Sequence, residues 1–391
     1  MNILILPHAV PDRKLKGRTI EIAKELAKDK NLKVYILERA HVYEDLTYGL
    51  KNFLKRCFIC KEKNNLIFVK VPYIPSLTIP FLSYNQKLLQ ELLAKLDIKV
   101  LINNFSHSFS IPESRNFVYV YDYVDDYVAF HKNPLVKKLM DRFIKKEVEK
   151  CDLLTVGTYS LGERIKKKGW KKDFMWLISG VSQTSFQNLN LDELNWIREK
   201  YNLNEKFVIG HIGYHDEKSG TEFLIDVFKK ALHRISNMVL LIVGPGPEIV
   251  RLKKKYGDER NIIFTGAVDP EKVNLYFLLS DVGTLPYIEH PSVHARFPVR
   301  LLDFIAARKI VISWPFGDLK LLNLPNVILV ERDVDKWVEA IVKAKELKWK
   351  TEWDYLFEEL STAKIVNNLK NRIFEVLEKI NNEKVGEIEK K

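Results

Sequence analysis

Cysteine is scarce in this chain of 391 residues, which contains only Cys57, Cys60 and Cys151. Three cysteines cannot form the disulfide framework of a secreted domain, so we expect a reducing compartment. Cys57 and Cys60 form a C-x-x-C pair, but a zinc ribbon needs a second pair of ligands and only Cys151 remains. We therefore favour the interpretation that this pair consists of ordinary packing or loop thiols over a metal or redox site, and the residues alone leave both interpretations open.

Long apolar runs and a charged leader are also missing. No stretch reaches the roughly 20 apolar residues that span a bilayer, and the apolar start Met1–Val10 lacks the basic segment of a signal peptide. We therefore expect a cytoplasmic protein. Cysteine and methionine number only 3 and 4, whereas Lys and Glu are abundant, a bias typical of thermophile proteins.

Positive charge is in excess, because the formal net charge is +12, and many of the basic residues lie between Lys132 and Lys172. Such a surface attracts nucleic acid, anionic lipid headgroups or a phosphorylated substrate. It is equally the solvated helix face of a Lys-rich protein. No helix-turn-helix, zinc finger or RNP-like aromatic motif accompanies the charge, so we expect no nucleic-acid partner.

The length suits two domains. Short Val/Ile/Leu runs alternate with amphipathic stretches, a pattern typical of parallel sheets with helices on both faces. The pattern restarts near Phe207. We therefore predict an α/β protein with two Rossmann-like domains facing across a cleft, residues 1–183 and 184–352, with a helix over 353–380 packing back on the first domain. In the first domain we also predict a helix over 88–96.

Two glycine-containing turns in the second half each join an apolar run to an amphipathic one, Gly213–Gly220 and Gly244–Glu248. A strand–turn–helix junction leaves backbone amides free at the helix N-terminus, where they suit a phosphate. Any Rossmann-like domain carries small residues at these turns, so each turn alone is a weak signal.

The segment Leu285–Ala307 is more informative. A strand ends there, a polar loop follows, and Pro298 opens a helix. Arg300 and Asp303 are three residues apart and share one helix face, and Arg296 lies just before the helix. A diphosphate at the helix start with a carboxylate one turn further for ribose hydroxyls is one interpretation. A salt-bridged surface helix is the other.

From Phe207 to Ser313 the chain resembles the C-terminal domain of family-4-type (group 1) glycosyltransferases, which have the GT-B fold. Five segments carry the resemblance in the family's order: G-Y-H-D-E-K-S-G, V-G-P-G-P-E, N-I-I-F-T-G-A-V, S-D-V-G-T-L-P-Y and F-P-V-R-L-L-D-F. The last is similar to the P-x-K-L-x-E-Y donor-site helix of a branch that synthesises cell-surface polysaccharides. The first half agrees more loosely, in K-G-R-T-I-E-I-A-K-E-L-A and V-Y-D-Y-V-D-D-Y.

The resemblance implies a retaining, metal-independent hexosyltransferase that uses a nucleotide-diphospho-sugar and no other cofactor. Protein cations and helix amides would then meet the charge of the leaving group. The positions that match the family's donor site are Gly213, Lys218, Gly244, Val268, Arg296, Pro298, Val299, Arg300, Leu301 and Asp303, with Lys218 also as a catalytic cation.

The acceptor, a glycan or a lipid-linked sugar, is expected on the first domain. Candidate acceptor residues are Lys16, Gly17, Arg18, His107 and Asp122, with Asp125 and Asp126 as catalytic carboxylates that orient or deprotonate a hydroxyl. Each aspartate is also a candidate for a capping or turn role, and His107 for an ordinary polar loop residue.

Three departures from the family pattern favour an alternative function. Tyr214 and Ser219 stand where the family has its phosphate arginine and lysine, and Ala295 replaces the first of its two donor-site glutamates. A glycosyltransferase-like protein that binds a nucleotide or glycan without turnover is therefore the second hypothesis.

The segment Val71–Tyr84 is apolar and carries Pro72, Pro75 and Pro80, which argue against a regular helix. Together with the basic surface, it suggests a peripheral contact with an anionic membrane at the inner face. A buried interdomain loop is the competing interpretation.

Overall fold

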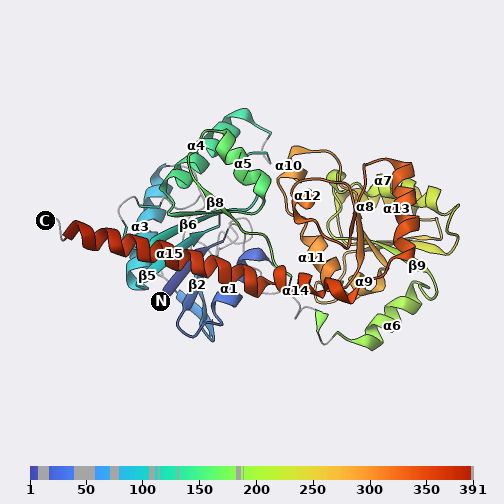
Figure 1. The fold of residues 1–391 in the computed structure, drawn as a ribbon, viewed down its shortest axis with the longest axis horizontal. Helices are drawn as coiled ribbons and strands as arrows, with labels where there is room; N and C mark the ends of the chain where they lie inside the picture. The colour runs from blue at the N-terminus through green and yellow to red at the C-terminus, as the bar shows by residue number, and fades with distance from the viewer. Residues whose placement is uncertain are drawn as a thin grey trace. The chain divides into compact units, whose positions relative to one another are not determined.

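The computed structural model describes residues 1–7, 17–38, 58–70, 79–104, 111–112, 115–129, 132–181, 186–187 and 189–388 (Figure 1). The chain divides into two compact units. The first comprises Met1–Ser179 and Thr362–Lys391, and the second comprises Gly180–Ser361.

The first unit contains a sheet of eight strands in the order β3-β4-β2-β1-β5-β6-β7-β8 over its described residues. The strands pair in parallel except β3, which is antiparallel to β4 at one edge. Helices cover the sheet, and every residue of β6 is buried, as continuous apolar runs predict. The strands are β1 (Asn2–Leu6), β2 (Lys33–Glu38), β3 (Phe58–Lys63), β4 (Leu66–Lys70), β5 (Ile98–Asn103), β6 (Val118–Tyr123), β7 (Leu153–Val156) and β8 (Phe174–Trp176). The helices are α1 (Arg18–Leu26), α3 (Ile79–Lys95), α4 (Pro134–Lys150), α5 (Tyr159–Lys167) and α15 (Thr362–Ile388).

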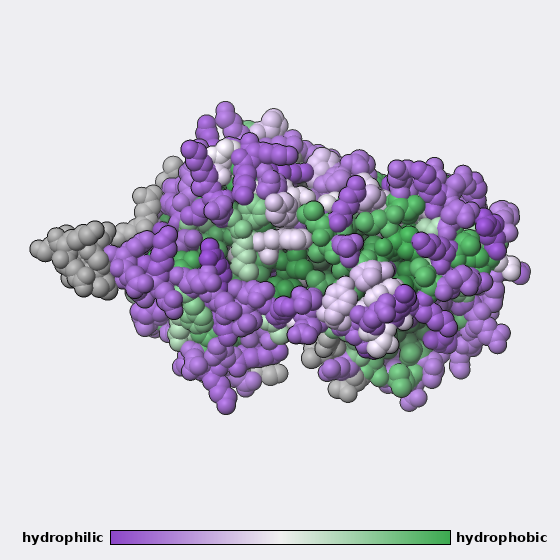
Figure 2. Space-filling model, in the orientation of Figure 1, coloured by the Kyte–Doolittle hydropathy of each residue, from purple (hydrophilic) through white to green (hydrophobic). Residues whose placement is uncertain are grey.

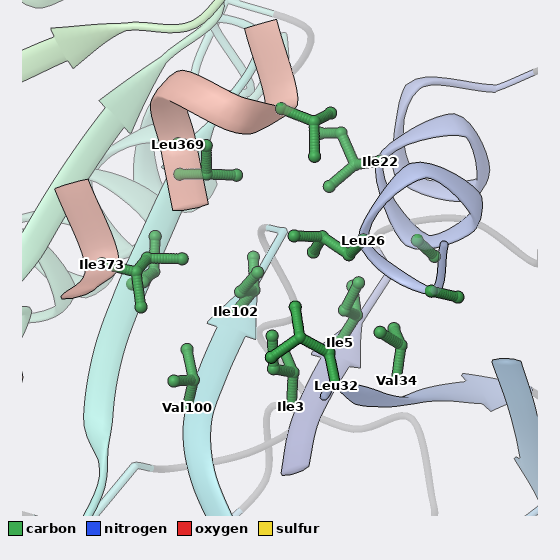
Figure 3. Packing of buried hydrophobic residues seen from close by; sticks show 14 of the residues in the cluster. Ile3, Ile5, Ile22, Leu26, Leu32, Val34, Val100, Ile102, Leu369 and Ile373 are labelled. Carbon is green, nitrogen blue, oxygen red and sulfur yellow. The ribbon is translucent and has the colours of Figure 1, made fainter. Parts of the chain in front are cut away.

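The last helix, α15, completes the core of the first unit. Leu369 and Ile373 of α15 are each 1% exposed and belong to the same buried cluster as Ile22 and Leu26 of α1 (Figure 3). Removing a buried leucine of this kind typically costs about 2–5 kcal/mol. The cluster therefore joins the two ends of the sequence into one hydrophobic core.

Two expectations for helices are wrong. The predicted helix over 353–380 is divided into η3 (Thr351–Asp354), α14 (Tyr355–Glu359) and α15. Leu360 and Ser361 interrupt it because their backbones pair with Val181, whose N–H donates to the Leu360 carbonyl at 2.6 Å. The prolines before residue 88 do not exclude a helix either. The helix predicted over 88–96 begins at Ile79, and Pro80 lies in its first turn, where a missing N–H costs no internal hydrogen bond. Residues 71–78 lie outside the described part.

The second unit contains a parallel sheet of six strands in the order β11-β10-β9-β12-β13-β14. This is the doubly wound order, in which the first strand lies at the centre and successive strands extend to either side of it. The strands are β9 (Phe207–Ile212), β10 (Met238–Val243), β11 (Ile262–Gly266), β12 (Val282–Leu285), β13 (Ile310–Ser313) and β14 (Val327–Leu329). The helices are α6 (Leu191–Lys200), η2 (Glu217–Ser219), α7 (Thr221–Ala231), α8 (Pro247–Tyr256), α9 (Val273–Leu279), α10 (Pro291–His294), α11 (Val299–Ala306), α12 (Leu319–Leu322) and α13 (Val334–Glu346), followed by η3 and α14.

Both sheets confirm the predicted class, α/β with two Rossmann-like units. In the second sheet the strand order reverses between β9 and β12, and ligands of such folds bind beside the carboxyl ends of the strands at that point. The loops that follow β9, β10 and β12 are therefore the first place to look for a site.

Candidate active site

The three loops at this reversal, residues 213–220, 244–246 and 286–298, are referred to as the switch-point loops. Backbone hydrogen bonds tie them together. The Ile288 N–H donates to the Lys218 carbonyl at 3.1 Å, and the His215 N–H donates to the Pro245 carbonyl at 2.9 Å. Segments far apart in sequence thus form one surface at the carboxyl ends of the central strands.

Arg300, in the first turn of α11, extends to the loop after β9. Its Nη2 donates to the Tyr214 carbonyl at 2.6 Å, and its Cζ lies 5.3 Å from the centroid of the Tyr287 ring. The guanidinium also lies against Gly213. A Cβ at that position would be 2.4 Å from the Arg300 Nε, and the φ of Gly213 is +132°. Gly213 is thus required both by its backbone angle and by the arginine beside it.

The guanidinium of Arg300 keeps one donor without a partner. Its Nη1 is buried and makes no hydrogen bond within the described part of the chain. Buried donors are almost always paired in folded proteins, and an unpaired one is costly. An anion placed at this point would accept from Nη1 and be bound by a group already held in position.

The amides of the two turn glycines, Gly213 and Gly244, are already hydrogen-bonded. The Gly213 N–H donates to the Val243 carbonyl at 2.8 Å, and the Gly244 N–H donates to the Gly266 carbonyl at 2.9 Å. Both bonds continue the sheet past the ends of its strands, so these amides are not free for a phosphate. Gly244 is needed for close packing instead, because its φ is +119° and a Cβ there would lie 2.0 Å from the Gly213 carbonyl oxygen.

The start of α11 is the better candidate for backbone donors. Its N-cap is Pro298, which makes no side-chain cap hydrogen bond, and Val299 in the first turn is 53% exposed. The Leu301 N–H donates to the Pro298 carbonyl at 2.9 Å, so it is already bonded. The positive end of the helix dipole therefore points out of the first turn beside Arg300, which favours a negative charge there.

The other predicted donor residues differ in how closely they join this group. Lys218 lies in η2 within the switch-point loops, and Asp303 is one turn beyond Arg300 on α11. Arg296 precedes α11 and has no ion-pair partner among the residues that the structure describes. Val268 follows β11, the edge strand, which β10 separates from β9.

A buried polar cluster beneath the loops was not predicted. His211 of β9 and His215 are fully buried, with ring centroids 4.7 Å apart. Thr221 Oγ1 lies 3.1 Å from His211 Nε2 and 3.2 Å from His215 Nδ1, and His215 Nε2 lies 2.9 Å from the Val243 carbonyl oxygen.

The protonation of this cluster follows from its burial. Burial, and then the field of Arg300, lower the pKa of His215 to about 4, although its bond to Val243 opposes the shift. Burial, His215 and Arg300 lower the pKa of His211 well below its usual value. At neutral pH both rings are therefore uncharged. A neutral His215 that donates to Val243 holds the loop after β9 against the end of β10.

Two predicted acceptor residues of the first unit form a buried ion pair. Arg18 Nη2 lies 2.9 Å from Asp122 Oδ1, and these side chains are only 9% and 2% exposed. The Asp122 carboxylate also accepts from Asn104 Nδ2 at 2.7 Å and from Thr155 Oγ1 at 2.6 Å. This gives Asp122 a structural role that joins α1, β5, β6 and β7. Its assignment to the acceptor stays a prediction.

The other first-unit residues take varied places. Gly17 is the N-cap of α1. The Asp125 carbonyl accepts from the Tyr127 N–H at 2.9 Å in the turn after β6. Asp126 accepts from the Ala129 N–H at 3.2 Å and forms an ion pair with Arg164, so it combines a turn role with a charged contact. Lys16 and His107 lie outside the described residues.

Of the three cysteines, only Cys151 has a described side chain. Cys151 is buried, and burial raises the pKa of its thiol to about 12, so it stays protonated at neutral pH. Cys60 lies in β3, and Cys57 is outside the described residues. Within the described part, no three His, Cys, Asp or Glu side chains gather as a metal site, and no helix is long and apolar enough to cross a membrane.

Comparison with known proteins matches part of the second unit to a family. Residues 206–346 match the family model described as glycosyl transferases group 1. This part of the second unit is therefore similar to the group 1 glycosyltransferase domain. The chain is also 33% identical over 131 residues to a putative teichuronic acid biosynthesis glycosyltransferase, TuaH, of Bacillus subtilis (strain 168). That alignment covers 32% of this chain and only 30% of the relative.

Solved structures extend the likeness in fold to nearly the whole chain. A glycosyltransferase from Rickettsia africae ESF-5 superposes with a TM-score of 0.72 at 17% identity, over 96% of this chain and 98% of that one. Sucrose-phosphate synthase from Thermosynechococcus elongatus gives 0.69 at 16% identity, over 96% and 99%. Anabaena HepE in complex with UDP gives 0.68 at 11%, over 96% and 100%. The fold of the chain is therefore GT-B.

The three departures from the family's donor motif have distinct surroundings. Tyr214 is 58% exposed, and its carbonyl receives Arg300. Ser219 is buried and lies 2.8 Å from Thr221 Oγ1, next to the histidine cluster. Ala295 is fully buried at the end of α10. The family's phosphate arginine and lysine are thus replaced by groups that do not carry charge, and Arg300, Arg296 and Lys218 stay the predicted cations of the donor site.

Proposed function

We propose that this protein is a retaining glycosyltransferase that moves a hexose from a nucleotide-diphospho-sugar to a carbohydrate or lipid-linked acceptor. One observation carries the proposal. Arg300 is held against Gly213 and the Tyr214 carbonyl at the switch point, and its buried Nη1 lacks a partner among the described residues. A diphosphate is the anion that suits such a donor beside the start of α11.

The proposed chemistry assigns each cation a task. When the bond between sugar and diphosphate breaks, negative charge grows on the leaving oxygen, and Arg300, Arg296 and Lys218 stabilise it. The first-turn amides of α11 add their dipole, and Asp303 accepts from the ribose hydroxyls. No metal and no further cofactor take part in this proposal, so protein groups alone meet the leaving charge. On the first unit, Asp125 or Asp126 orients the attacking hydroxyl or takes its proton.

Support for a role in cell-surface polysaccharide synthesis comes from the likeness to TuaH, whose own name refers to teichuronic acid biosynthesis. UDP is bound in the structurally similar HepE, which makes a uridine nucleotide the first donor to try. We place the reaction in the cytoplasm of a thermophile, at the inner face of the membrane if the acceptor is lipid-linked, with the basic first unit in peripheral contact with anionic lipid.

The test is a calorimetric panel of UDP, GDP, ADP, TDP and their sugars against the wild-type chain, Arg300→Ala and Asp303→Ala. We expect one nucleotide to bind, and both variants to bind it at least about tenfold more weakly. Arg308→Ala is the matched control. Arg308 directly follows the same helix, is exposed and pairs with Asp354 at 3.0 Å, so its loss should leave nucleotide affinity unchanged. Failure of all nucleotides to bind would overturn the proposal.

A glycosyltransferase-like binding protein without turnover is the second candidate, because Tyr214, Ser219 and Ala295 replace charged residues of the family motif. Hydrolysis of the donor in the absence of acceptor separates the two. Release of free sugar that Arg300→Ala abolishes supports an enzyme. Tight nucleotide binding without release, even with candidate acceptors added, supports the binding protein.

A further inference from the structure

A cavity of about 400 Å³ lies within the first unit, apart from the buried Arg18–Asp122 pair. It is bounded by the turn after β6, the first turns of α4, the helix α5 and the segment after it. Its lining residues are Tyr123, Asp126, Val128, Ala129, Lys137, Leu161, Arg164, Ile165, Lys167, Lys168 and Trp170. The volume is in the range of small-molecule sites.

The lining carries four cations and a single carboxylate. Arg164 pairs with Asp126, and Lys168 pairs with Asp141 on α4. Lys137 and Lys167 have no ion-pair partner among the described residues. The cavity therefore keeps a positive charge after its internal pairs are counted, and hydrophilic side chains dominate the face over α4 and α5 (Figure 2).

The inner wall of the cavity is apolar and aromatic. Leu161 and Ile165 of α5 are almost completely buried, and Tyr123 and Trp170 are only 4% and 8% exposed. The Lys168 ammonium lies 5.1 Å from the centroid of the Trp170 ring. A sugar ring has an apolar C–H face that packs on such a wall, while charged substituents would reach the lysines.

We propose that this cavity binds the acceptor through an anionic group, a carboxylate or a phosphate carried by a sugar. The inference rests on the proposed transfer reaction, because only a transferase has an acceptor. Asp126 lies in the lining with one oxygen on the Arg164 guanidinium and the other on the Ala129 amide. An acceptor anion near Arg164, Lys137 and Lys167 would thus place the sugar beside the carboxylate already proposed to orient its hydroxyl.

The experiment titrates the full chain with glucuronate, glucose 6-phosphate and glucose, without nucleotide, at low and high salt. At least one anionic sugar should bind, and the affinity for glucose should be at least about tenfold lower. High salt should lower the affinity for the anionic sugar and leave that for glucose unchanged. The carboxylate and phosphate arms identify which anion is preferred. Equal binding of glucose, or no binding of either anionic sugar, would overturn the proposal.

Variants locate the site. Lys137→Gln combined with Lys167→Gln should weaken the anionic sugar about tenfold, because both lysines are exposed lining residues. Lys145→Gln is the control, since Lys145 is also exposed and lies on α4, the helix of Lys137, but outside the lining. An equal loss in the control would refute the location. Nucleotide binding is measured on the same proteins. Absence of nucleotide binding would contradict the proposed function, whereas absence of anionic-sugar binding alone would contradict the proposal for this cavity.

Discussion

The contact between Gly213 and Arg300 makes a sharp prediction for Gly213→Ala. The new Cβ would lie 2.4 Å from Nε, 2.7 Å from Cζ and 2.8 Å from Nη2 of Arg300. Ordinary contacts between such atoms are about 3.5 Å, so the guanidinium must move by roughly 1 Å. That movement breaks its 2.6 Å bond to the Tyr214 carbonyl and removes the buried Nη1 from the position proposed for the diphosphate.

Two magnitudes follow from this geometry. The φ of +132° costs an alanine on the order of 1–3 kcal/mol, which lowers the melting temperature of a domain of this size by roughly 2–12 °C. Loss of an aligned, charge-assisted hydrogen bond lowers the affinity for the nucleotide by about ten- to a hundredfold. Differential scanning calorimetry measures the first effect, and titration calorimetry with the nucleotide found in the panel measures the second.

Gly266→Ala separates backbone strain from the contact with Arg300. Gly266 has a φ of +68°, and a Cβ there meets nothing within 4 Å. Its alanine should lower the melting temperature and leave nucleotide affinity intact. In the background of Arg300→Ala, Gly213→Ala should no longer change the affinity, because the displaced group is gone. Unchanged affinity in the single variant, or fully additive losses in the double variant, would refute the reasoning.

Three further predictions concern stability. Asp122→Ala should destabilise the first unit by about 3–5 kcal/mol in urea unfolding, since it leaves Arg18 buried without its partner; a loss below 1 kcal/mol would contradict the structural role. The depressed pKa of His215 means that the folded second unit binds fewer protons than the unfolded chain between pH 6.5 and about 4, so its contribution is full above 6.5 and is lost as pH falls toward 4. His215 should therefore account for a loss of up to about 3 kcal/mol in the stability of wild type across that window, to which His211 adds its own loss. In thermal melts across the window, His215→Gln should show a shallower dependence on pH than wild type; an identical slope in both proteins would exclude His215 as a source. Leu369→Ala should cost about 2–5 kcal/mol in the first unit, while Val250→Ala, at an exposed position of α8, should cost little in the same assay.

Much of the second unit could be predicted from its sequence. The bounds of β9, β10, β12 and β13 follow from mainly apolar runs that are long enough for a strand and end at glycine, proline or serine. Periodicity did not reveal β3, which is short, rich in lysine and lies at the edge of its sheet, where charged side chains are tolerated.

The candidate site was only partly predictable. The sequence predicts both Gly213 and Arg300 as donor-site residues. They lie far apart in the sequence, however, and nothing in it indicates that they are in contact. The turn motifs also do not reveal that the amides of Gly213 and Gly244 continue the hydrogen bonding of the sheet into the loops. The sequence does contain a signal for the burial of His211. A polar residue inside an apolar strand is buried, and a buried polar group needs a partner, here Thr221.

The return of α15 to the first unit makes the second unit an insertion within the first. During synthesis, Gly180–Ser361 emerges as one uninterrupted stretch and has all of its sheet available before the last helix is made. The first unit cannot complete its hydrophobic core until α15 has been synthesised, because residues of α15 cover α1. A nascent chain stopped at Ser361 would therefore hold a complete second unit and a first unit whose hydrophobic surface is still open. A minimal first unit would have to be built by joining Ser179 to Thr362 through a short linker.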